Sequence, residues 1–101
     1  MYILEYDIYY YSERYGRSVS VPKGYKSDGA TGAIDIYSEA WWCHDKLCDT
    51  GLWDDGAICT NWQASTVLSE ILKKEGRWIR AQYWFTFTWL FGGGKCRKNM
   101  W

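Results

Sequence analysis

The sequence predicts an α+β fold, in which an N-terminal β-hairpin or small antiparallel sheet packs against two or three α-helices. Tyr and Ile are concentrated in the first eleven residues, which favours a strand. Apolar residues between positions 58 and 72 recur at three- and four-residue spacing, which favours a helix. With 101 residues, 48% of them hydrophobic, the chain can form one core. We expect a single domain over residues 1–94 and a polar tail over 95–101.

The first element is a strand over residues 2–11, followed by a hairpin. One side of that strand is expected to face the core: Tyr2, Leu4, Tyr6, Ile8 and Tyr10. Residues 12–16 predict a hairpin loop with Gly16 in a left-handed conformation. A short return strand over 18–21 places Val19 and Val21 on one face, and Pro22 ends its pairing.

Two helices are expected after a glycine-rich loop over residues 24–36. Ser38 is a suitable N-cap for a helix that runs to about Cys48 and stops at Gly51. Asp54 or Asp55 can cap a second helix that reaches roughly to residue 75. This helix would carry one apolar stripe, made of Ile58, Trp62, Ser65, Leu68 and Leu72.

The segment from residue 77 to 91 predicts a third helix with an unusual surface. One helical face contains Ile79, Tyr83, Phe87 and Leu90, while Trp84, Phe85 and Trp89 cover other faces. Such a helix is either buried nearly all round or used in an interface. Alternation over residues 85–89 also permits a strand, but a helix is favoured. Residues 92–94 are glycines and predict a hinge.

Charge and hydropathy exclude several classes of partner. The 12 basic and 12 acidic residues balance, whereas a nucleic-acid footprint needs a basic face, so no nucleic acid is expected. The basic cluster Lys95, Arg97 and Lys98 predicts a solvated tail. The longest apolar run, residues 83–91, is too short to span a bilayer, so no transmembrane segment is expected. Near-zero net charge weakens the electrostatic repulsion between protein molecules, which favours a protein that functions as part of an assembly.

Four cysteines occur, at positions 43, 48, 59 and 96. Residues 1–12 do not show a charged segment followed by an apolar one, so we expect no secretory signal. Without export, free thiols are expected rather than disulfides.

The single histidine, His44, is the centre of the candidate site. An imidazole can act as a general base, ligate a metal, or form part of a paired core. As a base it would be oriented by Asp28 or Asp55, with Asp45 as a second carboxylate or metal ligand. The catalytic candidates are therefore His44, Asp28, Asp45 and Asp55. In the structural alternative, His44 bonds to Asp28 or Asp55 and ties a loop to two helix ends.

Metal binding is an open question at this stage. His44 and Cys48 have the i, i+4 spacing of a metal pair, but zinc needs two more ligands, for which Asp28, Asp55 or Cys59 would be candidates. No Cys-x-x-Cys or His-x-x-x-His pattern is present. No cofactor is expected.

Two segments resemble a family found in phages and prophages, catalogued as domain of unknown function 1353. Residues 21–31 read Val-Pro-Lys-Gly-Tyr-Lys-Ser-Asp-Gly-Ala-Thr, similar to its Val-Pro-x-Gly-Phe-x-(Ser/Thr)-Asp-(Gly/Leu)-Ala-Ser motif. Residues 44–48, His-Asp-Lys-Leu-Cys, resemble its His-Asp-x-Leu-Tyr helix, and the likeness extends over about residues 21–93. Cys48 replaces Tyr, Thr31 replaces Ser, and Gly32 stands where Pro is frequent. The resemblance implies phage origin and a recurring polar set of Asp28, His44, Asp45 and Asp55, but no settled activity.

The cysteine-flanked His-Asp pair is also similar to the His-Asp helix of secreted phospholipases A2. In that family the His is a base and the Asp a calcium ligand, after a glycine-rich loop. Here the cysteine spacing and the glycine pattern both differ, so the likeness is an analogy only.

Two functions follow as hypotheses. The favoured one is a bacteriophage virion or assembly accessory of the head or tail, or a host-interaction protein, with a structural His/Asp cluster. Its partner would be a phage or host protein, or further copies of the chain, in the host cytoplasm or the virion. The alternative is a small lysis-associated phage hydrolase that uses His44 with Asp28 or Asp55. The first is favoured because no nucleophile motif, phosphate loop or complete metal set is visible.

Overall fold

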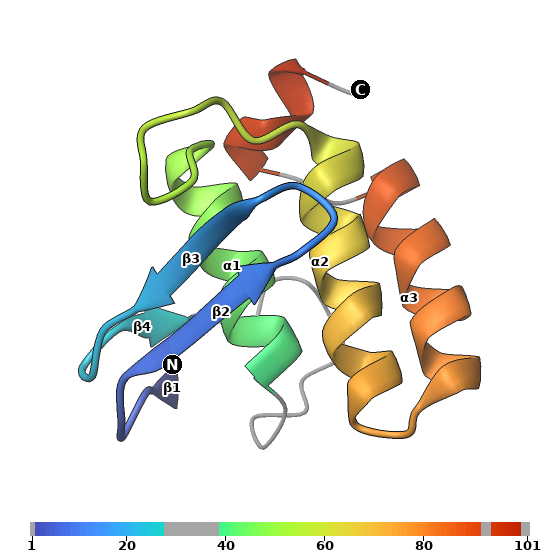
Figure 1. Cartoon of the computed structure of the whole chain (residues 1–101), viewed down its shortest axis with the longest axis horizontal. Helices are drawn as coiled ribbons and strands as arrows, with labels where there is room; N and C mark the ends of the chain where they lie inside the picture. The colour runs from blue at the N-terminus through green and yellow to red at the C-terminus, as the bar shows by residue number, and fades with distance from the viewer. Residues whose placement is uncertain (1, 28–38, 92–93, 100–101) are drawn as a thin grey trace.

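A computed structural model of the chain describes residues 2–27, 39–91 and 94–99, and it confirms the α+β class. Strand β1 (Tyr2–Ile3) pairs with β4 (Lys26–Ser27), and β2 (Ile8–Ser12) pairs with β3 (Arg17–Val21), both antiparallel. The helices are α1 (Glu39–Thr50), α2 (Asn61–Lys74) and α3 (Trp78–Phe91), followed by a short 3₁₀ helix, η1 (Gly94–Lys98). The β2–β3 hairpin packs on α1, α2 stands beside α1, and α3 lies on the far side of α2 (Figure 1).

The predicted hairpin is present with the expected inward face. Ile8 lies opposite Val21 in the antiparallel register, and Val19 lies opposite Tyr10. Ile8, Val19 and Val21 are buried, because alternate side chains of both strands point towards the helices. Gly16 has a φ of +63°, so the turn uses the left-handed conformation that glycine adopts without steric cost.

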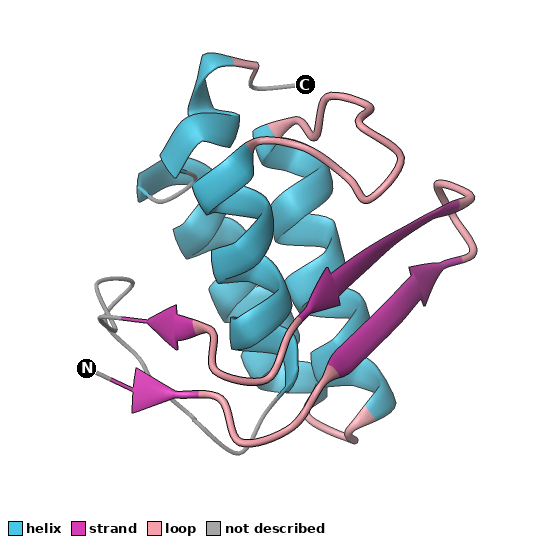
Figure 2. Cartoon of the chain, turned by 90° about the vertical axis from the view of Figure 1, so that its left-hand side faces the viewer, coloured by secondary structure: helices cyan, strands magenta, loops and turns pink. Residues whose placement is uncertain are grey.

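The prediction of one continuous strand over residues 2–11 is wrong. The chain bends at residues 4–7, because Leu4 pairs with the segment after the hairpin: its N–H donates to Tyr25 O (2.9 Å) and its carbonyl accepts from Gly24 N (2.8 Å). At the bend, Asp7 accepts a hydrogen bond from Lys23 N at 2.7 Å. The bend leaves the Tyr6 side chain 51% exposed, whereas alternation placed it in the core. Figure 2 shows the resulting pair of ribbons along one side of the helices.

The start of the second helix also differs from the prediction. Helix α2 begins after Thr60, not at Asp54 or Asp55, because Thr60 and Gln63 form a reciprocal capping box. Gln63 N donates to Thr60 Oγ1, and Thr60 N donates to Gln63 Oε1, both at 3.1 Å. Ile58 therefore lies in the preceding loop, where it is 61% exposed, instead of in the apolar stripe.

The third helix is confirmed as a helix. Gly76, with a φ of +81°, reverses the chain after α2 so that α3 runs back along it (Figure 1). Ala81 and Thr88 of α3 are fully buried, and Thr88 Oγ1 lies 2.9 Å from Ser65 Oγ of α2. The Trp62 ring packs edge-on against two rings of α3. Among the described helices, none is long and apolar enough to cross a membrane.

The C-terminal segment folds back onto the first two helices. Cys96 of η1 is fully buried and donates from Sγ to Leu47 O of α1 (3.1 Å), and Asn99 O accepts from Asn61 N of α2 (2.6 Å). The basic side chains of this segment, Lys95, Arg97 and Lys98, are exposed, as the sequence predicts. Part of the expected tail is therefore fastened to the domain, and Arg97 adds to this because its Nη2 donates to Leu90 O of α3 at 2.8 Å.

Candidate functional site

His44 lies inside the domain, on the side of α1 that faces the core. Its side chain is fully buried, and the edge of the Trp41 ring, one turn earlier, meets it at a centroid distance of 6.1 Å. One turn later, Cys48 Sγ lies 3.6 Å from His44 Nε2. The i, i+4 spacing thus brings the predicted pair together, as a thiol beside an imidazole.

Cys48 belongs to a group of three thiols from three elements, and two of them, Cys48 and Cys96, act on the imidazole. Cys96 of η1 is hydrogen-bonded to Cys48 of α1 and to Cys59 of the loop before α2. These bonds to Cys96 raise the pKa of Cys48 and of Cys59, and burial adds to the effect. The same two bonds lower the pKa of Cys96. All four cysteines are free, and burial raises the pKa of Cys43.

Burial also fixes the protonation state of His44. Removal from water lowers its pKa from 6.5 to about 4, although the charge on Cys96 acts in the opposite direction. The imidazole is therefore neutral near pH 7. A general base must reach the proton that it takes and must titrate near the working pH. A fully buried imidazole with this pKa favours a structural role for His44, but its described polar contact is with Cys48 and not with Asp55, which the structure pairs with Arg17.

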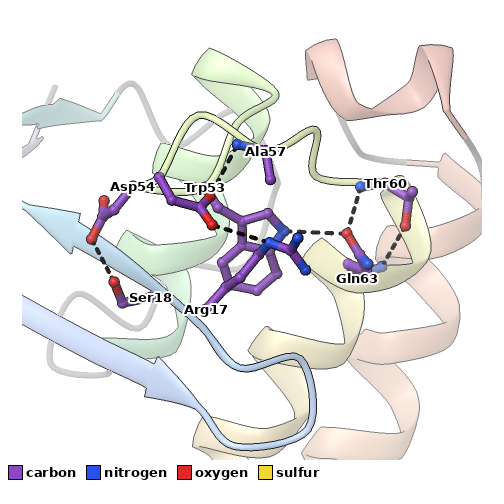
Figure 3. A network of polar contacts seen from close by, with 8 residues as sticks. Arg17, Ser18, Trp53, Asp54, Ala57, Thr60 and Gln63 are labelled. Atoms are coloured by element: carbon purple, nitrogen blue, oxygen red, sulfur yellow. Dashed lines mark hydrogen bonds and ion pairs between the residues drawn. The ribbon is translucent and has the colours of Figure 1, made fainter.

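The predicted carboxylates lie in different surroundings. Asp45 follows His44 on α1 and is half-buried. Asp55 is exposed in the loop before α2, where Arg17 Nε lies 3.3 Å from Oδ2 and Ala57 N donates to Oδ1 (Figure 3). The structure thus ties Asp55 to strand β3 through Arg17. Asp28 lies outside the described residues, so its predicted pairing with His44 stays a prediction.

Asp54, predicted only as a helix cap, fastens the loop of residues 51–60 to the hairpin. Its Oδ2 accepts from Ser18 Oγ (3.0 Å) and Ser20 Oγ (2.7 Å), and its Oδ1 accepts from Ser20 N (3.0 Å). Its own N–H donates to Ser18 O at 3.0 Å, so one residue makes four bonds to β3. The sequence signal for this contact was the alternation Ser18-Val19-Ser20-Val21, which puts two hydroxyls on the outward face. Figure 3 shows the loop between the hairpin and the α2 capping box.

A second carboxylate that sequence reasoning missed, Glu70, joins α2 to the hairpin. Its Oε1 accepts from Tyr10 Oη (3.0 Å) and from the fully buried Ser12 Oγ (3.1 Å). Arg14 Nε lies 3.6 Å from Oε2. Asp54 therefore holds the loop before α2 on the hairpin, and Glu70 holds α2 itself on it.

Metal binding finds no support within residues 2–27, 39–91 and 94–99. In these ranges, no group of three or more His, Cys, Asp or Glu side chains could hold a metal ion. The pairing of His44 with Cys48 is therefore a contact between a thiol and an imidazole, without a metal ligand set around it in these ranges.

A different surface, the outer face of α3, carries exposed apolar side chains. We define it by the exposed Ile79, Tyr83, Leu90 and Phe91 and by Phe87, which is half-buried between two of them. Ile79 is 87% exposed, Phe91 72%, Tyr83 60% and Leu90 43%. The aromatic rings form a continuous row, since Phe87 stacks on Tyr83 at 6.4 Å and meets Phe91 at 5.3 Å. Helical spacing puts this row on the side of α3 opposite to the buried Ala81 and Thr88. Helix α3 itself lies at the edge of the molecule (Figure 1).

Comparison with protein families, with curated proteins and with solved structures found no match for this chain. The resemblance to the phage family therefore stays a prediction.

Proposed function

We propose that the protein is a non-enzymatic assembly protein, a head or tail accessory of a phage virion or a protein that binds a host protein. In this proposal the residues around His44 belong to the core, and the outer face of α3 makes the functional contact. The observation that carries it is this contrast: His44 is fully buried, while Ile79, Tyr83, Leu90 and Phe91 of α3 are exposed to solvent. Phage origin rests on the sequence resemblance alone.

The size of the outer face supports this role. With about 150–250 Å² for a fully exposed aromatic side chain, the exposed fractions of its members give an apolar area on the order of 500 Å². An apolar patch of about 300–600 Å² is the largest that a typical monomer exposes, and it is often functional. The buried contacts of α3 are made by other residues, Ala81 and Thr88, with Trp84 partly buried against the core.

The alternative of a small hydrolase is less well supported by the described residues. It needs a base that a substrate can reach, whereas His44 is fully buried and neutral near pH 7. A replacement that keeps the core packed, His44→Gln, tests this alternative directly. Loss of a hydrolytic activity by this variant, with its melting temperature unchanged, would support the enzyme and contradict our proposal.

Particle incorporation tests the proposal itself. The chain would be expressed during infection by the phage that encodes it, and its copy number per purified particle measured by quantitative mass spectrometry. Two substitutions form a matched pair: Tyr83→Arg on the outer face of α3, and Tyr9→Arg on β2, where the side chain is similarly exposed. We expect stoichiometric incorporation of the native chain and of Tyr9→Arg, and loss of Tyr83→Arg.

An outcome in which the native chain is absent from particles would remove the virion role. A complex with a defined host protein that depends on Tyr83 and not on Tyr9 would then support the host-binding form of the proposal. Equal behaviour of the two variants in both assays would contradict it.

A further inference from the structure

We infer that Cys48 and Cys96 form a reversible disulfide when the folded protein meets a low-molecular-weight disulfide such as oxidised glutathione, and that this bond fastens η1 to α1. Cys59, the third thiol of the group, stays reduced beside the pair. Neither the outer face of α3 nor a reactive His44 is needed for this step, so the disulfide and the proposed function can fail separately.

The two sulfurs are already in contact in the reduced protein. Cys96 is hydrogen-bonded to Cys48, and its Sγ lies 3.1 Å from the carbonyl oxygen of Leu47, the residue before Cys48. The backbones are close as well, since a Cβ placed on Gly94 would lie 3.1 Å from the Cβ of Cys48. A disulfide needs such proximity, because its two Cβ atoms lie only about 3.8 Å apart. The bond can therefore form with η1 in its present place on α1.

Exposure selects Cys48 over Cys59 as the partner of Cys96. Cys59 and Cys96 are fully buried, whereas Cys48 is half-buried. A disulfide reagent in solution has to reach a sulfur before it can exchange with it. Cys48 is therefore the thiol of this group that the reagent meets first, and Cys96 follows because it is already in contact with Cys48.

The reaction is thiol–disulfide exchange in two steps. Cys48 attacks glutathione disulfide, which breaks the S–S bond of the reagent, forms a mixed disulfide on Cys48 and releases one glutathione. Cys96 then attacks the Cys48 sulfur and releases the second glutathione. The two thiol protons of the protein end on the two glutathione sulfurs. The protein is thus oxidised by two electrons, and glutathione disulfide is reduced by two.

The surroundings of Cys96 support the second step. Its hydrogen bonds with Cys48 and Cys59 lower its pKa, and the bond with Cys59 is still possible once Cys48 carries glutathione. A lower pKa favours the thiolate, which is the form that attacks a disulfide. Cys59 therefore acts as a donor to the attacking sulfur and does not enter the bond itself.

The disulfide would tie the C-terminal segment covalently to the first helix. It closes a loop over residues 48–96, roughly half of the chain, and a loop of this length strongly restricts the unfolded state. We expect the oxidised protein to melt about 10–20 °C above the reduced protein. Addition of dithiothreitol should restore the lower melting temperature, because the bond is reversible.

Mass spectrometry of the native chain tests the pairing without any variant. The folded protein is equilibrated with mixtures of reduced and oxidised glutathione, quenched with an alkylating reagent, and weighed intact. We expect a species lighter by two hydrogen atoms. Digestion before aspartate cuts at Asp49 and Asp54, between Cys48 and Cys59, so the linked peptide identifies the partner of Cys96. A native chain that stays reduced in every mixture, or a link from Cys59 to Cys96, would overturn the inference.

Serine variants provide the matched set. Cys48→Ser and Cys96→Ser should form no internal disulfide and should show no rise in melting temperature under oxidation, whereas Cys59→Ser should behave like the native chain. Cys43→Ser is the control, because Cys43 is also buried on α1 but lies about 140° around the helix from Cys48. Far-UV circular dichroism of the reduced proteins shows which variants are folded. An internal disulfide in folded Cys48→Ser, or its loss in folded Cys43→Ser or Cys59→Ser, would contradict the assigned pair.

Discussion

Acid should destabilise this protein through its single histidine. His44 has a pKa of about 4 in the folded protein, against 6.5 in an unfolded chain, because burial disfavours the imidazolium. Between these two values the unfolded state binds more protons, so the free energy of unfolding falls as the pH is lowered. The stabilisation is fully present above about pH 6.5 and is lost as the pH falls towards 4.

The size of the effect follows from the two pKa values. A difference of one pKa unit corresponds to about 1.4 kcal/mol, so the difference between 6.5 and about 4 amounts to about 3 kcal/mol once both states are protonated. The part lost between pH 7 and pH 5 is about 2 kcal/mol. This is a large share of the 5–15 kcal/mol that is typical of a domain.

Urea denaturation of the native chain and of His44→Gln, from pH 7 to pH 5, measures this difference. The variant cannot titrate at this position, so its loss over the range should be smaller by about 2 kcal/mol. Carboxylates that titrate in the same range affect both proteins and cancel in the comparison. An NMR titration gives the pKa directly, since one histidine produces one set of imidazole signals. An imidazole pKa near 6.5, or equal acid sensitivity of the two proteins, would refute the burial argument.

Three further predictions concern the joints between elements, each measured by urea or thermal denaturation. Asp54→Ala should lower the free energy of unfolding by about 1–3 kcal/mol, because it removes the bonds that hold its loop to β3. Asp55→Ala removes an exposed ion pair and one exposed hydrogen bond within its own loop, and should lower it by less than Asp54→Ala does. Glu70→Ala should cost about 1–3 kcal/mol, because it leaves a buried hydroxyl of β2 without its acceptor. Gly94→Ala should lower the free energy of unfolding more than Gly24→Ala does, although both glycines have a positive φ. A Cβ at position 94 would lie 2.8 Å from a backbone oxygen of α1, whereas a Cβ at position 24 meets nothing within 4 Å. A similar loss within either pair, or no loss for Glu70→Ala, would contradict the corresponding contact.

The sequence predicted the fold class and the hairpin because those signals are local. Alternation over residues 18–21 and the glycine at position 16 depend on neighbours in the chain, and both are confirmed. The start of α2 was missed because two suitable caps, Asp54 and Thr60, lie six residues apart. Periodicity alone does not decide between them. The Asp54 carboxylate is used by the serines of β3, which leaves Thr60 to form the capping box.

The candidate site was predicted less well, because some residues that meet there are far apart in the sequence. The pairing of His44 with Cys48 follows from helical spacing and is present. The approach of Cys96 depends on η1 folding back over about fifty residues, and no local pattern in the sequence reports it. Several polar residues lie close to His44 in the sequence, but the sequence does not show which of them contact it in the fold. The structure supplies thiols there, and it ties Asp55 to Arg17.

The chemistry of those thiols bears on how the domain holds its C-terminal end. A carboxylate beside His44 would stabilise the imidazolium and raise its pKa, as in many catalytic pairs. Protonated thiols stabilise the imidazolium only weakly. The effect of Cys96 raises the pKa of His44, but it offsets only part of the lowering that burial causes. The cluster therefore keeps His44 neutral while it joins α1, the loop before α2 and η1 in one buried contact. A buried junction of this kind is in keeping with the proposed function, in which the contact surface belongs to α3, on the far side of α2 from α1 (Figure 1).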